Sequence, residues 1–150
     1  MIHLNRTDSD NTDFQLLVRL LDADLAIRDG DDHAFYAQYN KTNTLKQVLV
    51  LYEDTNAIAC GAIRPLDEKK MEVKRMFVLP EFRNKGLASM VLSALENWAK
   101  ELGYQNCVLE TGKKQPEAIA LYEKAGYRRI PNYGQYAGIE NSVCFEKKLS

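Results

Sequence analysis

One stretch of the sequence constrains the fold more than any other: a helical pattern enclosed between two strand-like runs. From residue 87 to residue 102 apolar side chains recur at helical spacing on one face, and Gly103 follows the last of them. Apolar runs at residues 71–79 and 106–111 flank this pattern. A strand that returns parallel after a helix does so by a right-handed crossover, and ligands gather beyond the carboxyl ends of such strands. The apolar helix positions are Leu87, Met90, Val91, Ala94, Leu95, Trp98, Ala99 and Leu102.

The other patterns complete a mixed α/β protein of 150 residues, a length that fits one domain over residues 1–150. A helix is expected after Asn11 or Thr12, one of which caps it, and a short helical piece at 32–39. Pro116 begins a further helix that Gly126 ends. Strands are predicted at 2–6, 47–52, 58–63, 127–130 and 142–149.

The charge and cysteine content narrow the partners and the compartment. The 20 basic and 21 acidic residues leave a net charge of −1, which disfavours nucleic acid and anionic lipid as partners. The three cysteines lie inside apolar runs without C-x-x-C spacing and indicate buried thiols in a reducing compartment. His3 and His33 have no ligand spacing, so no metal site is expected. Without a signal-peptide pattern or an 18-residue apolar run, we expect a cytoplasmic protein with no membrane partner.

The turn at residues 83–88, Arg-Asn-Lys-Gly-Leu-Ala, lies between the first strand and the long helix. The first N–H groups of a helix have no intrahelical partner and stand at the positive end of its dipole. A glycine-containing turn there presents donors to an anion, and Arg83 and Lys85 add charge. The turn therefore predicts a phosphate site, with a solvated basic loop as the alternative.

Two motifs together resemble the Gcn5-related N-acetyltransferase (GNAT) family. Arg83 to Ala88 fits the family pattern of Arg or Gln, two residues, Gly, one residue, Gly or Ala. Residues 115–127 resemble its later block, Asn-x-x-Ala-x-x-Leu-Tyr-x-x-x-Gly-Phe, with Gln115 in place of Asn. The resemblance implies a mostly antiparallel central sheet, splayed at one parallel pair and flanked by about four helices.

The resemblance further implies acetyl-coenzyme A (acetyl-CoA) as cosubstrate and no metal. Its pyrophosphate would rest on the backbone N–H groups of the turn, and its pantetheine arm would pair with a strand end like an added strand. The implied cofactor-binding residues are Phe77, Val78, Arg83, Asn84, Lys85, Gly86, Leu87, Ala88, Gln115 and Tyr122.

Two carboxylates are candidates for the base that the implied reaction needs. A lysine-type amine has a reference pKa of about 10.4, so a proton must leave before the amine attacks. Glu72 stands where several family members carry a glutamate base, and Glu110, at the end of the neighbouring strand, is the alternative. Each also has a structural interpretation as half of an ion pair: with Lys70 or Lys74 for Glu72, and with Arg75 or Lys113 for Glu110.

Tyr122 matches the family's tyrosine that stabilises the departing thiolate, with a core tyrosine as the alternative.

The implied function is acetyl transfer to a primary amine by direct attack in a ternary complex. An acyl-CoA-binding regulatory module without turnover, and acetylation of protein amines, are the alternatives. Many family members are dimers, so a homodimer is left open.

Charged and aromatic residues around the expected cleft are the guide to the acceptor. Acidic residues before the second strand, Asp29, Asp31 and Asp32, favour a cationic amine, whereas Arg64, Lys74 and Arg75 favour a carboxylate or phosphate. Together they predict a small cationic or zwitterionic amine, with solvated charges as the alternative. Tyr133 and Tyr136 lie in a glycine-bearing loop and either cover the ligand as a lid or pack on the sheet.

Overall fold

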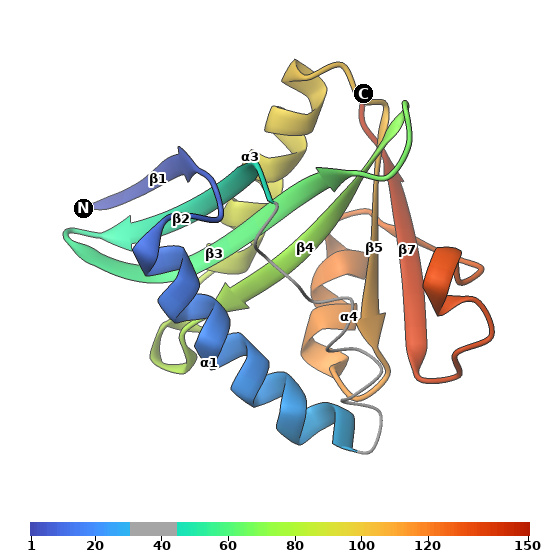
Figure 1. Ribbon diagram of the computed structural model, residues 1–150, viewed down its shortest axis with the longest axis horizontal. Helices are drawn as coiled ribbons and strands as arrows, with labels where there is room; N and C mark the ends of the chain where they lie inside the picture. Colours follow the sequence, from blue (N-terminus) through green and yellow to red (C-terminus); the bar gives the residue numbers. More distant parts are fainter. Residues whose placement is uncertain (31–44) are drawn as a thin grey trace.

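The computed structural model describes residues 1–30 and 45–150, so the helix expected at 32–39 lies outside the described residues. The elements follow one another as strands and helices in a mixed order (Figure 1). They are β1 (Ile2–Thr7), α1 (Thr12–Asp29), β2 (Gln47–Glu53), β3 (Asn56–Pro65), β4 (Lys70–Val78), the 3₁₀ turn η2 (Pro80–Phe82), α3 (Leu87–Glu101), β5 (Asn106–Gly112), α4 (Pro116–Lys124), β6 (Arg128–Ile130), the 3₁₀ turn η3 (Gly134–Tyr136) and β7 (Ser142–Lys148).

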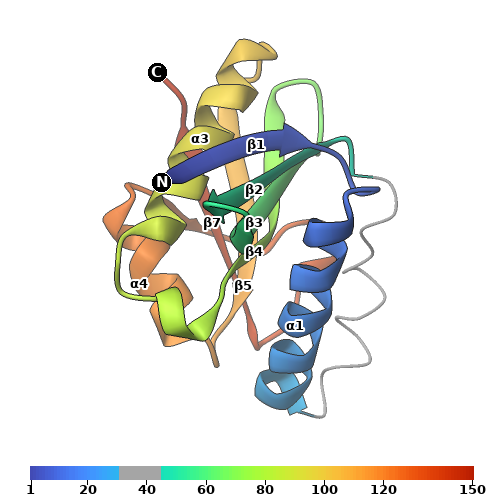
Figure 2. The same ribbon diagram turned by 90° about the vertical axis from the view of Figure 1, so that its left-hand side faces the viewer.

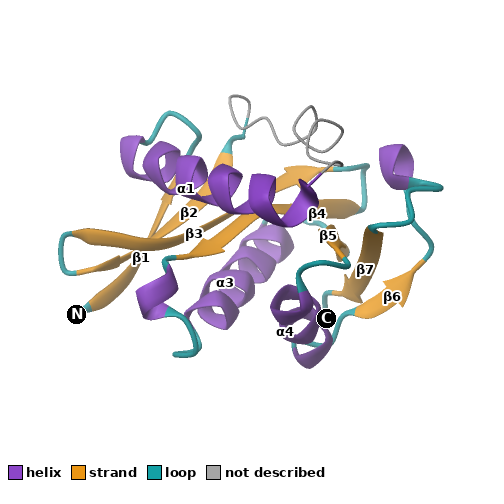
Figure 3. Cartoon of the chain, turned by 90° about the horizontal axis from the view of Figure 1, so that it is seen from below, coloured by secondary structure: helices purple, strands orange, loops and turns teal. Residues whose placement is uncertain are grey.

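All the described strands join one seven-stranded sheet in the order β1-β2-β3-β4-β5-β7-β6. Only β4 and β5 are parallel, and every other neighbouring pair is antiparallel. Helix α1 covers one face of the sheet, and α3 and α4 cover the other (Figures 2 and 3). The predicted mixed α/β fold with one parallel pair is confirmed.

The parallel pair opens after a short contact. Strands β4 and β5 pair only where Lys70 to Glu72 face Asn106 to Val108, and beyond that point they diverge. On the other side of β4, the register with β3 shifts between Cys60 and Ala62, and Arg75 adopts a φ of 60°. An extra residue of this kind bends a strand and increases its twist. The bulge in β4 therefore stands where the two strands begin to separate.

Helix α1 begins where the sequence indicated. The Asn11 side chain accepts a hydrogen bond of 2.8 Å from the N–H of Phe14, so Asn11 is the cap. Phe14, Leu17 and Leu21 are buried with Val48, Cys60 and Phe77 of the sheet in one apolar cluster. The helix is thereby fixed against the face of the sheet that carries the polar residues described below.

The face of α3 differs from the predicted one at its margins. Met90 is 42% exposed, Trp98 is only half-buried, and the Arg6 guanidinium lies 4.6 Å from the centre of its ring. Glu96 is instead buried, because it accepts hydrogen bonds from Tyr127 (2.8 Å) and from Lys147 (3.0 Å). Met90 is thus more exposed than its place in the apolar pattern indicates, and Trp98 packs against the core at its margin, since a spacing rule sees neither neighbouring strands nor buried polar partners.

The three cysteines are buried and free, as predicted. Burial raises the pKa of Cys60 and of Cys107 to about 12, and that of Cys144 to about 11. Thiols this weakly acidic are inert near neutral pH.

Candidate active site

A cleft of about 700 Å³ opens where β4 and β5 separate. Its walls come from the second half of α1, from β4, from the end of β5, and from the first turns of α3 and α4. This volume suits a small-molecule ligand. The predicted site residues that line it are Glu72, Arg75, Phe77, Val78, Arg83, Asn84, Gly86, Leu87, Ala88, Glu110, Gln115, Tyr122 and Tyr136.

Three predicted residues do not line the cleft directly, and two others are not described by the structure. Lys85 is not among the cleft residues, and its Nζ lies 5.4 Å from the centre of the Phe82 ring. Arg64 and Tyr133 reach the site through contacts with Glu72. Asp31 and Asp32 lie outside the described residues.

The turn before α3 has the geometry of an anion site. Asn84 and Gly86 have φ values of 64° and 78°, and Gly86 stands at the N-cap of α3. A Cβ built on Gly86 meets nothing within 4 Å, so the space in front of the helix end is open. The unpartnered N–H groups of the first turn, at Leu87 and Ala88, adjoin that space.

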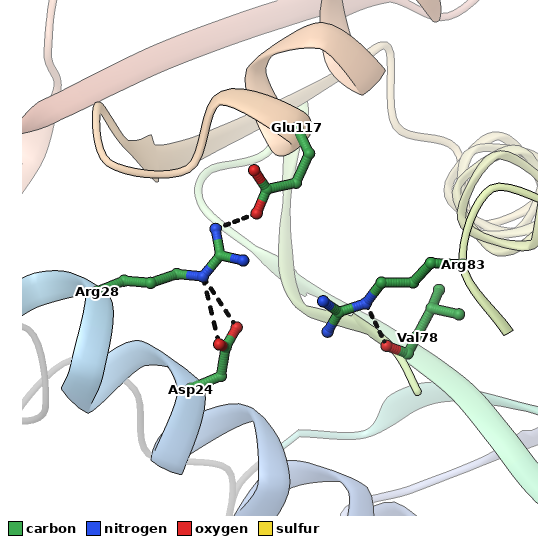
Figure 4. A network of polar contacts seen from close by, with 5 residues as sticks. All are labelled: Asp24, Arg28, Val78, Arg83 and Glu117. Atoms are coloured by element: carbon green, nitrogen blue, oxygen red, sulfur yellow. Dashed lines mark hydrogen bonds and ion pairs between the residues drawn. The ribbon is translucent and has the colours of Figure 1, made fainter. Parts of the chain in front are cut away.

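Arg83 ties the turn to the end of β4 by a hydrogen bond. Its Nε donates a hydrogen bond of 2.9 Å to the carbonyl of Val78, and its guanidinium lies 5.6 Å from the centre of the Phe77 ring (Figure 4). A pantetheine arm that pairs with the end of β4 must share or displace this bond.

A cluster that the sequence did not indicate bridges α1 and α4 across the cleft. The Arg28 side chain donates from Nε to Asp24 (3.3 Å to Oδ1) and from Nη1 to Glu117 (Figure 4). Burial raises the pKa of Glu117, but hydrogen bonds from its own backbone and from Arg28 outweigh this, and the pKa is lowered overall. No local pattern reveals the bridge, because 89 residues separate its two ends.

Glu72 is the centre of the polar cluster on the α1 face. Its Oε2 accepts a hydrogen bond of 2.6 Å from the Tyr133 hydroxyl, and its side chain is only 4% exposed. Arg64 Nε and Lys74 Nζ stand 3.9 and 4.0 Å from Oε1, so the predicted ion pair with Lys74 is present at long range. The alternative partner, Lys70, contacts Glu146 at 3.0 Å.

Glu110 lies on β5 and faces the same cleft. The Ser142 hydroxyl donates a hydrogen bond of 2.7 Å to its Oε2. Arg75, one of the partners considered for Glu110, instead donates from Nη2 to Asp22 of α1. Both candidate carboxylates therefore border the cleft, one on each of the two diverging strands.

Tyr122 both packs in the core and lines the cleft. Its ring lies 5.8 Å from that of Tyr127 and 6.3 Å from that of Phe145. Burial raises the pKa of Tyr122, and the charge of Glu110 raises it further. The hydroxyl therefore stays protonated at neutral pH and is able to give up a proton or a hydrogen bond.

The two loop tyrosines pack on the sheet. Tyr136 is buried against Cys144, and its ring meets that of Tyr133 edge to face at 5.8 Å. Of the two interpretations of this loop, the structure has the packed one, and Tyr133 still contacts a candidate base.

Comparison with known proteins places this fold and cleft in a family. The profile of the Acetyltransferase (GNAT) family matches residues 14–127. "IAA acetyltransferase" of Azospirillum brasilense is 36% identical over 102 residues, which are 67% of this chain and 67% of that protein. "Uncharacterized N-acetyltransferase YsnE" of Bacillus subtilis is 33% identical over 100 residues, 65% of this chain and 66% of that one, so the matched segment spans about two thirds of these relatives.

Among solved structures, an acyl-CoA N-acyltransferase of Klebsiella pneumoniae superposes with a TM-score of 0.84 at 28% identity, over 100% of this chain and 99% of that one. The chain therefore belongs to the acetyltransferase (GNAT) family, and the resemblance noted in the sequence is confirmed, as is the expected class of enzyme.

Two structural findings concern metals and membranes. The described residues hold no group of three or more His, Cys, Asp or Glu side chains arranged to bind a metal ion. Among the same residues, no helix has the length and apolar content needed to cross a membrane.

Proposed function

We propose that this protein transfers the acetyl group of acetyl-CoA to the primary amine of a small cationic or zwitterionic molecule. The observation that carries the proposal is that one cleft joins the glycine-containing turn of α3 to two carboxylates and Tyr122. The Azospirillum relative is named for IAA, a small molecule, which supports a small acceptor. We further propose that residues 1–150 form one cytoplasmic domain. Light scattering would test whether the protein forms a homodimer.

Acetyl-CoA binding follows from the turn and the end of β4. The pyrophosphate would accept hydrogen bonds from the N–H groups at Leu87 and Ala88, at the positive end of α3. The pantetheine arm would lie between the diverging ends of β4 and β5, where these two strands no longer pair with each other. A GNAT structure from Elizabethkingia anophelis, with a TM-score of 0.72 at 19% identity and 99% of this chain covered, has acetyl-CoA bound.

The transfer needs a base on the acceptor side. An acceptor amine between the diverging strands would lie near Glu72 and Glu110, either of which takes the proton directly or through water. The neutral amine then attacks the thioester carbon in a ternary complex, the C–S bond breaks, and the Tyr122 hydroxyl stabilises or protonates the thiolate of CoA.

Release of free thiol, measured over a panel of amines with wild-type protein and four variants, tests this proposal. Glu72→Gln, Glu110→Gln and Tyr122→Phe each keep the shape of the side chain, and Glu123→Gln on the exposed side of α4 is the control. Loss of a general base or acid lowers kcat by about 10²- to 10⁴-fold. We expect such a loss for Tyr122→Phe and for one of the two glutamate variants, with the affinity for acetyl-CoA retained.

The alternatives give different results. A regulatory acyl-CoA-binding module would bind acetyl-CoA but release no thiol with any amine. A protein acetyltransferase would prefer peptides to every small amine in the panel. Retained turnover in all three variants would remove Glu72, Glu110 and Tyr122 from the mechanism.

A further inference from the structure

Three cationic side chains meet on the acceptor side of the cleft. Arg64 of β3 stands opposite Glu72 of β4, and Lys74 follows two residues later on the same face. The Lys74 side chain is 6% exposed, and that of Arg75 is 2% exposed. Each of these two cations faces a carboxylate, as buried cations usually do, because an unpaired buried charge is costly.

The Arg75 guanidinium has a donor without a partner. Its Nη2 is bonded to Asp22, but its Nε is buried and makes no hydrogen bond within the described part of the chain. Arg75 also lines the cleft. A buried donor without a partner costs free energy, and a ligand that accepts its hydrogen bond removes that cost.

Charge around Lys74 favours an anion there. Burial lowers the pKa of Lys74, and Arg64 and Arg75 lower it further, whereas Glu72 and Glu110 oppose the change. A carboxylate bound beside Lys74 acts like Glu72 and Glu110: it raises the pKa of Lys74 and favours the charged ammonium.

The spacing of Glu72 and Lys74 suits a ligand that carries both charges. Lys74 Nζ is 4.0 Å from Glu72 Oε1, beyond the distance of a hydrogen bond. The amine of an aminocarboxylate, with its two charged groups one or two carbons apart, is able to contact Glu72 while its carboxylate contacts Lys74. A ligand of this kind adds a direct charge-assisted hydrogen bond to each of the two side chains.

We propose that the acceptor is a short aminocarboxylate whose carboxylate is held by Lys74, with Arg64 and Arg75 beside it, and whose amine lies against Glu72. This inference rests on the proposed acetyltransferase function. It narrows the acceptor from cationic or zwitterionic amines to zwitterions with adjacent charges.

The test compares matched acceptors. Thiol release from acetyl-CoA is measured for the standard α-amino acids, for their carboxamides and for the corresponding decarboxylated amines. Binding of the same compounds to the CoA-loaded protein is measured by calorimetry. We expect the best amino acid to exceed its amide and its amine by about 10- to 100-fold in kcat/KM, the effect of one hydrogen bond to a charged group.

Lys74→Met is the diagnostic variant, and Lys70→Met, on the same strand but outside the cleft, is its control. Lys74→Met is expected to remove the preference of the enzyme for the acid over the amide, mainly through KM, and Lys70→Met to keep it. Circular dichroism and acetyl-CoA affinity verify that both variants are folded.

Four outcomes overturn the inference. The first is an amine without a carboxylate that is acetylated as well as every amino acid, and the second is a Lys74→Met variant that keeps the preference. The third is that acetyl-CoA binds but no amino acid is bound or acetylated. In each of these, turnover of other amines leaves the proposed function standing. The fourth outcome, that no amine leads to release of thiol, rejects both the inference and the proposed function.

Discussion

A substitution of Gly61 provides a quantitative test of how closely α3 packs against the sheet. It lies on β3 opposite the bulge of β4. A Cβ at this position would stand 2.6 Å from Met76 Sδ, 2.9 Å from Leu95 Cδ1 and 3.0 Å from Val91 Cγ1. These neighbours belong to β4 and to α3, so no single side-chain movement relieves all three contacts. Gly61→Ala therefore requires several of these side chains to move together, or the helix or the bulge to shift.

The magnitude follows from two opposing effects. The backbone of Gly61 is not in the left-handed region, so alanine alone would stabilise the protein by about 0.4–1 kcal/mol through the unfolded state. Overpacking a well-packed core costs about 1–3 kcal/mol. We expect the cost of overpacking to exceed the gain, so that the free energy of unfolding falls by about 1–2 kcal/mol and the Tm by about 2–8 °C.

Thermal unfolding by circular dichroism measures this change. Met76→Ala removes the nearest clashing atom, so the double variant should lose at least about 0.5 kcal/mol less than the sum of the two single variants. A Gly61→Ala protein with an unchanged or higher Tm refutes the close approach of α3 to the bulge.

Three further predictions concern single contacts. Arg83→Gln should weaken acetyl-CoA binding by about 10- to 100-fold in calorimetry, whereas Lys85→Gln, outside the cleft, should change it by less than about threefold. Because the pKa of Glu117 is lowered on folding, Glu117→Gln should lower the Tm at pH 7. The difference from wild type should shrink as the pH falls from the ordinary value of 4.5 through the lowered pKa of the folded protein; a difference that does not depend on pH contradicts this. That difference should correspond to less than about 1 kcal/mol, since the Glu117 side chain is 57% exposed. Tyr127→Phe should cost about 1–3 kcal/mol in urea unfolding because it removes the 2.8 Å hydrogen bond to buried Glu96, and an unchanged midpoint would show that this bond contributes nothing.

The parts of the fold that the sequence predicted are those that local patterns encode. Helix α3 and its turn follow from a repeat of apolar residues, a glycine and a basic pair, all within about two dozen residues of one another. The cap at Asn11 and the start of α4 at Pro116 are equally local.

The features that the sequence did not predict arise from contacts between distant segments. Glu96 is buried because Tyr127 and Lys147, on other elements, satisfy its carboxylate. Likewise, Arg28 meets Glu117 only because α1 and α4 border the same cleft. The turn could be recognised as an anion site, but the cluster of Asp24, Arg28 and Glu117 across the cleft could not.

Calorimetric titration of acetyl-CoA into the wild-type protein and an Ala88→Glu variant tests the central claim most directly. A glutamate in the first turn of α3 suits the helix dipole, so the variant should fold, but its charge and bulk oppose a pyrophosphate at the turn. We predict one acetyl-CoA site per wild-type chain and a loss of affinity of more than about 100-fold in the variant, since a charge-assisted contact is replaced by repulsion. No binding to the wild-type protein at millimolar acetyl-CoA, or equal binding to a folded Ala88→Glu protein, would contradict the account.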